Sequence, residues 1–169
     1  MTFLKAYNDS TFVKYAISVI ISFTFLSIVT FGQDSNSTLS PASGRMTPFV
    51  TDLKGISIGM SSDEVLEKLG KPKVKDDAGM LFSLGKKEAV QIGIGTKGLV
   101  RTIALIYEDG NRNAPVFEDI FGSTVEKNEN EDGSVYKMIR YDDDGFWLAY
   151  SQTAGDSTFT TLTMGRINR

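Results

Sequence analysis

One stretch, Gly55–Pro72, carries the local signals of a short helix together with both of its ends. Ser61 is a favourable N-cap, and Glu64 three residues later completes the pattern of a capping box. Gly70 can close a helix in a left-handed conformation, and the proline two residues later prevents continuation. The sequence therefore predicts a capped helix between Ser61 and Gly70, with one apolar face.

Strand patterns dominate the rest of the chain. Alternating apolar residues predict β-strands over 80–84, 89–94, 99–107, 135–141, 146–152 and 158–164. A second helix is predicted over 114–121, where Asn113 can cap it, Pro115 suits its first turn and Gly122 closes it.

The two predicted helices and their following strands have the same order, offset by about fifty residues. This order indicates a tandem αβββ repeat with units at about 55–108 and 113–167. Because each unit has little apolar surface of its own, we expect the two to form one core. The expected fold class is α+β, with an antiparallel β-sheet and two helices on one face.

The N-terminal region has the pattern of an export signal. An uncharged apolar run, 15–33, follows Lys5 and Lys14 and ends with small residues before Gln33. We predict a signal peptide over 1–32, a disordered linker over 33–48 and a single α+β domain over 49–169. An uncleaved N-terminal anchor is the alternative, since a spanning helix needs about 20 apolar residues. Both predict an exported protein, periplasmic or secreted, or tethered to the membrane by its N-terminal helix.

The composition limits the classes of catalytic and binding chemistry open to the chain. The chain contains neither cysteine nor histidine and has a net charge of −3. Disulfides and the triads built on histidine or cysteine are therefore excluded. No basic run indicates nucleic acid as a partner. We expect no catalytic residues, no cofactor and no metal, and a protein that is not an enzyme.

Three glycine- or aspartate-rich motifs have a plainer explanation than ligand binding. Gly93–Gly98 matches G-x-G-x-x-G, but a strand pattern follows it where a dinucleotide site needs a helix, so a hairpin turn is favoured. Asp142–Gly145 and Asn128–Gly133 resemble calcium loops but lack the closing bidentate glutamate, which favours solvated turns. Weak calcium binding at 142–144 stays an alternative.

The most suggestive residues are aromatic. If Asp142–Gly145 is a four-residue hairpin loop, Tyr141 pairs with Phe146 and Arg140 with Trp147. One face of the hairpin then belongs to the core, and the other has the composition of a protein-binding hot spot. The predicted partner-binding residues are Tyr136, Met138, Arg140 and Trp147. The alternative is a one-residue shift that places Trp147 in the core.

The first helix also resembles a known family. Residues 59–72 have the pattern G-M-S-x-x-E-V-x-x-x-L-G-x-P and resemble the signature of the SmpA/OmlA (BamE-like) group, within the β-lactamase-inhibitor-protein-like fold class. The resemblance implies an exported, non-enzymatic module that presents one sheet face to another protein. Without cysteine the chain lacks the lipidated cysteine of BamE-type proteins and the disulfides of the inhibitor, so the resemblance implies a fold rather than either role.

Together these features predict an exported, non-enzymatic protein-interaction module of the bacterial cell envelope, which binds an envelope or extracellular protein through one sheet face. The alternative is a periplasmic small-ligand binder, or a carboxylate-dependent enzyme, with a cleft between the two units.

Overall fold

The computed structural model describes residues 48–168. The predicted signal peptide and almost all of the predicted linker lie outside the described residues. Two helices and eight strands make up the described part. They are α2 (Ser62–Leu69), β1 (Val74–Lys75), β2 (Gly79–Gly85), β3 (Glu88–Ile94), β4 (Val100–Glu108), α3 (Phe117–Phe121), β5 (Asn128–Glu129), β6 (Val135–Tyr141), β7 (Phe146–Gln152) and β8 (Phe159–Arg166). Among these residues, no helix has the length and hydrophobicity needed to cross a membrane.

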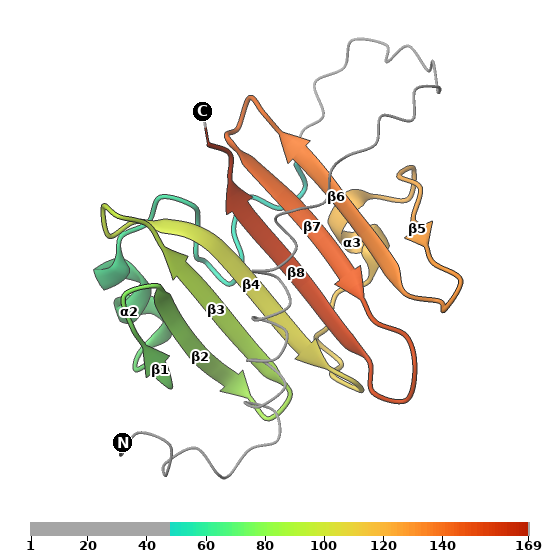
Figure 1. The fold of residues 1–169 in the computed structure, drawn as a ribbon, viewed down its shortest axis with the longest axis horizontal. Helices are drawn as coiled ribbons and strands as arrows, with labels where there is room; N and C mark the ends of the chain where they lie inside the picture. Colours follow the sequence, from blue (N-terminus) through green and yellow to red (C-terminus); the bar gives the residue numbers. More distant parts are fainter. Residues whose placement is uncertain (1–47, 169) are drawn as a thin grey trace. The chain divides into compact units, whose positions relative to one another are not determined.

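All eight strands form one antiparallel sheet in the order β1-β2-β3-β4-β8-β7-β6-β5 (Figure 1). Hairpins connect β2 to β3, β3 to β4, β6 to β7 and β7 to β8. The middle of the sheet is the long-range pair β4–β8, in which Ile103 lies opposite Met164 and Leu105 opposite Leu162. The predicted α+β class with an antiparallel sheet is therefore confirmed.

The hydrophobic core contains alternate residues of the central strands and the apolar side chains of both helices. Val65 of α2 and Phe117, Ile120 and Phe121 of α3 are buried in this cluster. The largest strand side chains with less than 2% exposure are Phe82, Val90, Ile92, Val100, Ile103, Leu148 and Met164. Burying such side chains contributes roughly 1.5–3 kcal/mol each, which makes this cluster the main source of stability.

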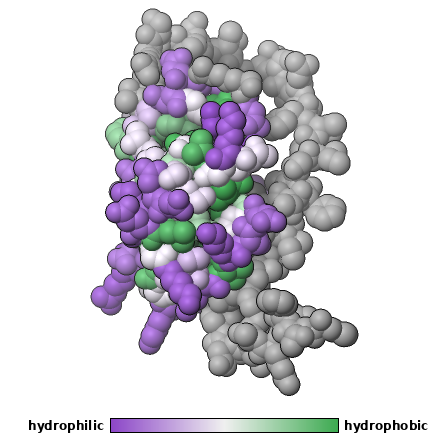
Figure 2. Space-filling view, turned by 90° about the vertical axis from the view of Figure 1, so that its left-hand side faces the viewer, coloured by the Kyte–Doolittle hydropathy of each residue, from purple (hydrophilic) through white to green (hydrophobic). Residues whose placement is uncertain are grey.

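Helix α2 begins and ends as the sequence predicts. The Ser61 hydroxyl accepts a hydrogen bond from the Glu64 N–H at 3.3 Å, and the Glu64 carboxylate accepts one from the Ser61 N–H at 2.8 Å. Gly70 has φ 76° and donates its N–H to the carbonyl of Leu66. Figure 2 shows the side of the domain with α2 and β1, where hydrophilic side chains surround small, separate hydrophobic areas.

The second helix is shorter than predicted. α3 begins at Phe117 rather than at residue 114, and Val116 precedes it in an extended conformation. The position before a proline disfavours the helical conformation, which explains why Ala114 does not join the helix. The Asp119 carboxylate accepts a hydrogen bond from the Val116 N–H at 3.4 Å. The N-terminal end of α3 is therefore held by Asp119 and not by the predicted Asn113 cap.

The segment before α2 holds the β3–β4 turn in place. The Gly59 N–H donates to the Val100 carbonyl at 2.9 Å, and the Val100 N–H donates to the Met60 carbonyl at 2.8 Å. The glycine-rich Gly93–Gly98 motif is the β3–β4 hairpin and not the start of a helix, as the sequence favoured. A register shift between Gly93 and Ile94 marks the start of this turn.

Candidate functional site

The four predicted partner-binding residues lie on one face of the β6–β7 hairpin. Tyr141 pairs with Phe146 and Arg140 with Trp147, which is the predicted register. Tyr136, Met138 and Arg140 therefore alternate with the core residues of β6, and Trp147 lies across from Arg140. The alternative register, with Trp147 in the core, is wrong. We call Tyr136, Met138, Arg140 and Trp147 the aromatic face.

Three members of the aromatic face are exposed. Tyr136 is 42% exposed and Met138 41%, and both are among the exposed large hydrophobic residues of the described chain. The Arg140 side chain is 54% exposed and lies 3.0 Å from the Asp142 carboxylate. Such an exposed pair contributes little to stability, so the guanidinium can exchange this contact for another acceptor. Partial burial raises the pKa of Tyr136 above its ordinary value. Its hydroxyl can donate a hydrogen bond to a partner.

Trp147 is half-buried because it packs on the neighbouring strand. It pairs with Gly165 of β8, and a side-chain methyl group at position 165 would overlap the indole ring. One ring face thus rests on a glycine. Aromatic side chains fixed in this way lose little conformational entropy when a partner binds.

The edge of the sheet beside the aromatic face is mostly open. β5 pairs only Asn128 and Glu129 with β6, opposite Tyr136 and Val135. Within the described chain, no strand lies against the outer edge of β6 beyond Tyr136. Unpaired main-chain groups on an edge strand can pair with an extended segment of another chain.

Two turns that sequence analysis assigned to simple hairpins lie at one pocket. The β3–β4 turn and the β6–β7 turn line opposite sides of a cavity of about 600 Å³, together with the end of β8. Its charged residues are Lys97, Arg101, Arg166, Asp143 and Asp144. Sequence reasoning missed the three cations, because only the β4–β8 pairing brings Arg101 and Arg166 together. No local pattern in the sequence carries that information.

A buried carboxylate also escaped the sequence analysis. Glu88 is 6% exposed, and its Oε1 atom lies 2.7 Å from Lys54 Nζ. The same Oε1 accepts no hydrogen bond with good geometry, so the contact is an ion pair alone. Tyr107 lies opposite Glu88 in β4; burial and the Glu88 charge raise the pKa of Tyr107 to about 12. Glu88 does not line the pocket, and its charge is balanced by Lys54.

Weak calcium binding at Asp142–Asp144 stays a prediction of the sequence. Within residues 48–168, no group of three acidic side chains is placed to hold a metal ion.

No protein-family model matches the chain, so its resemblance to the SmpA/OmlA group stays a prediction. No curated protein matches it either. Among solved structures, the chain is similar to a DUF4309 family protein (YjgB) from Bacillus subtilis subsp. subtilis str. 168. The two share 13% identity over 67% of this chain and 83% of that one, with a TM-score of 0.46.

Proposed function

We propose that this protein is an exported, non-enzymatic interaction module of the bacterial cell envelope that binds a protein partner through the aromatic face. The observation that carries the proposal is the grouping of Tyr136, Met138 and Arg140 with Trp147 on one sheet face. Tyrosine, tryptophan, methionine and arginine are the residues enriched at the centres of protein interfaces.

A tandem αβββ repeat with two helices on one face of the sheet is part of this proposal. Each half of the domain runs from a helix through a two-residue strand into three longer strands. Apolar residues of α2 and α3 share one buried cluster, and Figure 1 draws both helices behind the sheet. The aromatic face lies on the side of β6 and β7 that faces away from this cluster.

The open edge of β6 suggests how the partner binds. An extended segment of the partner pairs with the β6 backbone at 137–141 and lays its side chains against Tyr136 and Met138. Main-chain hydrogen bonds provide affinity in such complexes, and alternate side chains provide specificity.

Site-specific crosslinking tests the proposal. A photoreactive amino acid at Met138 should crosslink the chain to one envelope protein in living cells. The same group at Val74, an exposed residue of β1 at the opposite edge of the sheet, serves as the matched control. Equal crosslinking from both positions would contradict a specific face.

A pair of double variants separates binding from folding. Arg140→Ala/Trp147→Ala should abolish recovery of the crosslinked partner, and circular dichroism should show that the variant folds. Val74→Ala/Lys75→Ala removes an apolar and a basic side chain from β1 and should leave recovery unchanged. If the folded Arg140→Ala/Trp147→Ala variant still captured the partner, the aromatic face would not be the binding site.

Export rests on the sequence of residues 1–33, and N-terminal sequencing of the cellular product tests it. A product that starts at Gln33 supports a cleaved signal peptide. A product that keeps residues 15–33 and partitions with membranes supports the tethered form. A full-length product in the cytoplasm would contradict export.

A further inference from the structure

The pocket at the end of the central strands has an unusual charge arrangement. Lys97 comes from the β3–β4 turn, Arg101 from the start of β4, and Arg166 from the end of β8. The β6–β7 turn contributes Asp143 and Asp144. These five are the titratable residues that line the cavity within the described chain, and they leave one net positive charge.

The three cations outnumber the two carboxylates that line the pocket. The ion pairs within residues 48–168 include neither Lys97 nor Arg166. Arg101 donates from Nη2 to the Asn168 side-chain oxygen at 3.1 Å, which is a neutral acceptor. Cations gathered in a concave site favour an anion, because the attraction of each for it adds to that of the others.

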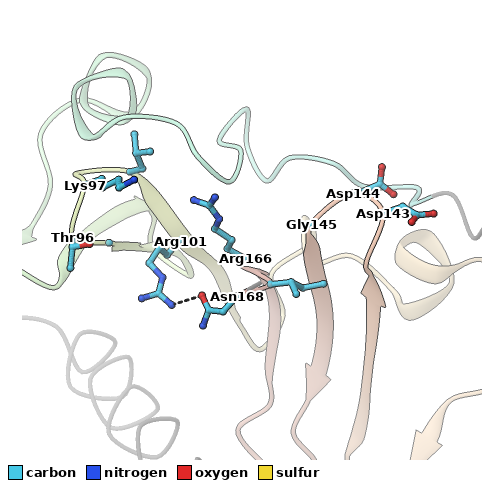
Figure 3. A pocket seen from close by; sticks show the side chains of 11 residues that line it. Thr96, Lys97, Arg101, Asp143, Asp144, Gly145, Arg166 and Asn168 are labelled. Atoms are coloured by element: carbon cyan, nitrogen blue, oxygen red, sulfur yellow. Dashed lines mark hydrogen bonds between the residues drawn. The ribbon is translucent and has the colours of Figure 1, made fainter.

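Figure 3 shows how these side chains lie. Arg166 points from the end of β8 into the space between the turn with Lys97 and the turn with Asp143 and Asp144, while Arg101 turns toward Asn168. Arg166 is therefore the cation placed to meet a ligand. Its planar guanidinium can bind a carboxylate or phosphate with two parallel hydrogen bonds.

Both walls of the pocket are held by hydrogen bonds, so the site is formed before a ligand binds. The Ser62 N–H and hydroxyl both donate to the Gly98 carbonyl, at 3.1 and 3.0 Å. On the other wall, the Ile167 N–H donates to the Gly145 carbonyl at 2.9 Å. Because the turns are already fixed, little ordering free energy opposes binding.

We propose that this pocket binds a small organic anion with a carboxylate or phosphate group, held by Arg166 and Lys97. Leu99 and Ile167 also line the pocket and provide apolar contact for the rest of the molecule. The cavity volume suits a metabolite-sized ligand. This inference does not depend on the aromatic face, since the two sites share no residue.

Calorimetric titration of the full chain with inorganic phosphate and, separately, with succinate tests the proposal. We expect saturable binding of at least one probe, weaker at higher salt because the charges are near the surface. Binding of phosphate alone identifies a phosphate ligand, and binding of succinate alone identifies a carboxylate. If neither probe binds, or if calcium binds and both anions do not, the proposal is wrong.

Variants at position 166 locate the binding site. Arg166→Ala should raise the dissociation constant about tenfold or more, since charge-assisted hydrogen bonds are lost. Arg166→Lys should give an intermediate dissociation constant, because lysine keeps the positive charge but cannot form the two parallel hydrogen bonds of a guanidinium. Arg112→Ala makes the same charge change in an exposed loop outside the pocket and should leave the constant unchanged. Arg166 is exposed, so circular dichroism should show folded variants. Equal affinity in Arg166→Ala and the unmodified chain would overturn the assignment.

Discussion

Trp147 rests directly on Gly165, its partner across β7 and β8, and this contact fixes the only tryptophan of the chain. The glycine at 165 is required by space and not by backbone conformation, because the indole ring occupies the volume where a side chain would begin. The aromatic face thus depends on a residue eighteen positions further along the chain.

Gly165→Ala should displace the indole of Trp147. We expect its fluorescence emission to shift to longer wavelength as the ring becomes more solvated, with a loss of about 1–3 kcal/mol in the free energy of unfolding. Gly85→Ala is the matched control, since a Cβ there meets no atom within 4 Å and the backbone conformation is ordinary. An unchanged emission spectrum in Gly165→Ala would show that the indole does not lie on Gly165.

Ser61→Ala should destabilise the domain by about 1 kcal/mol, because the first turn of α2 loses its cap. Urea unfolding measures the effect. Ser61→Thr keeps the hydroxyl and should recover most of the stability. If Ser61→Ala unfolded at the same urea concentration as the unmodified chain, the capping box would contribute nothing to folding.

The capping box also predicts a dependence of stability on pH. Hydrogen bonds from the Ser61 hydroxyl and N–H lower the pKa of Glu64 below its ordinary 4.5. A carboxylate with a lower pKa in the folded state stabilises fully above its unfolded pKa, and this contribution is lost as the pH falls through the folded pKa. Urea unfolding measures the free energy of unfolding at pH 7 and in acid. The difference between these two values should be smaller for Glu64→Gln than for the unmodified chain. An identical difference would contradict the role of Glu64.

The ion pair between Lys54 and Glu88 should contribute more to the stability of the fold than a pair of two exposed side chains. In Lys54→Asn, the new side chain is compatible with the positive φ of 57° at this turn. The substitution leaves the buried Glu88 carboxylate without its cation. We expect a loss of about 2 kcal/mol, less than the roughly 3–5 kcal/mol of a fully buried pair, because the Lys54 side chain is 39% exposed.

A double variant tests the cause of that loss. Adding Glu88→Gln removes the unpaired charge and should restore much of the stability lost in Lys54→Asn, as thermal unfolding would measure. A double variant less stable than Lys54→Asn alone would show that the loss has another origin.

Tyr107 should be the last tyrosine to ionise. Burial and the Glu88 charge raise its pKa to about 12 in the folded state. Because the pKa of Tyr107 is higher in the folded state, its protonated hydroxyl stabilises the folded chain. This contribution is complete below the ordinary pKa of about 10 and is lost as the pH rises towards about 12. Alkaline titration of tyrosinate absorbance should show a late phase that disappears in Tyr107→Phe. Ionisation of Tyr107 together with the other tyrosines would contradict this assignment.

The sequence by itself determined the elements whose causes are local. The capped helix α2 follows from Ser61, Glu64 and Gly70, which interact within one or two turns. The register of β6 and β7 follows from a four-residue loop, so the position of Trp147 opposite Arg140 was predictable.

The tertiary structure decided everything that depends on β4 meeting β8. Many strands of this chain have an alternating apolar pattern, so the pattern does not specify which of them pair. That pairing places Arg101 near Arg166 in one pocket, and the β7–β8 pairing sets Trp147 on Gly165. The contact between Lys54 and Glu88 also depends on the tertiary structure. Contacts between residues distant in sequence are determined by packing of the whole core and not by local conformational preference.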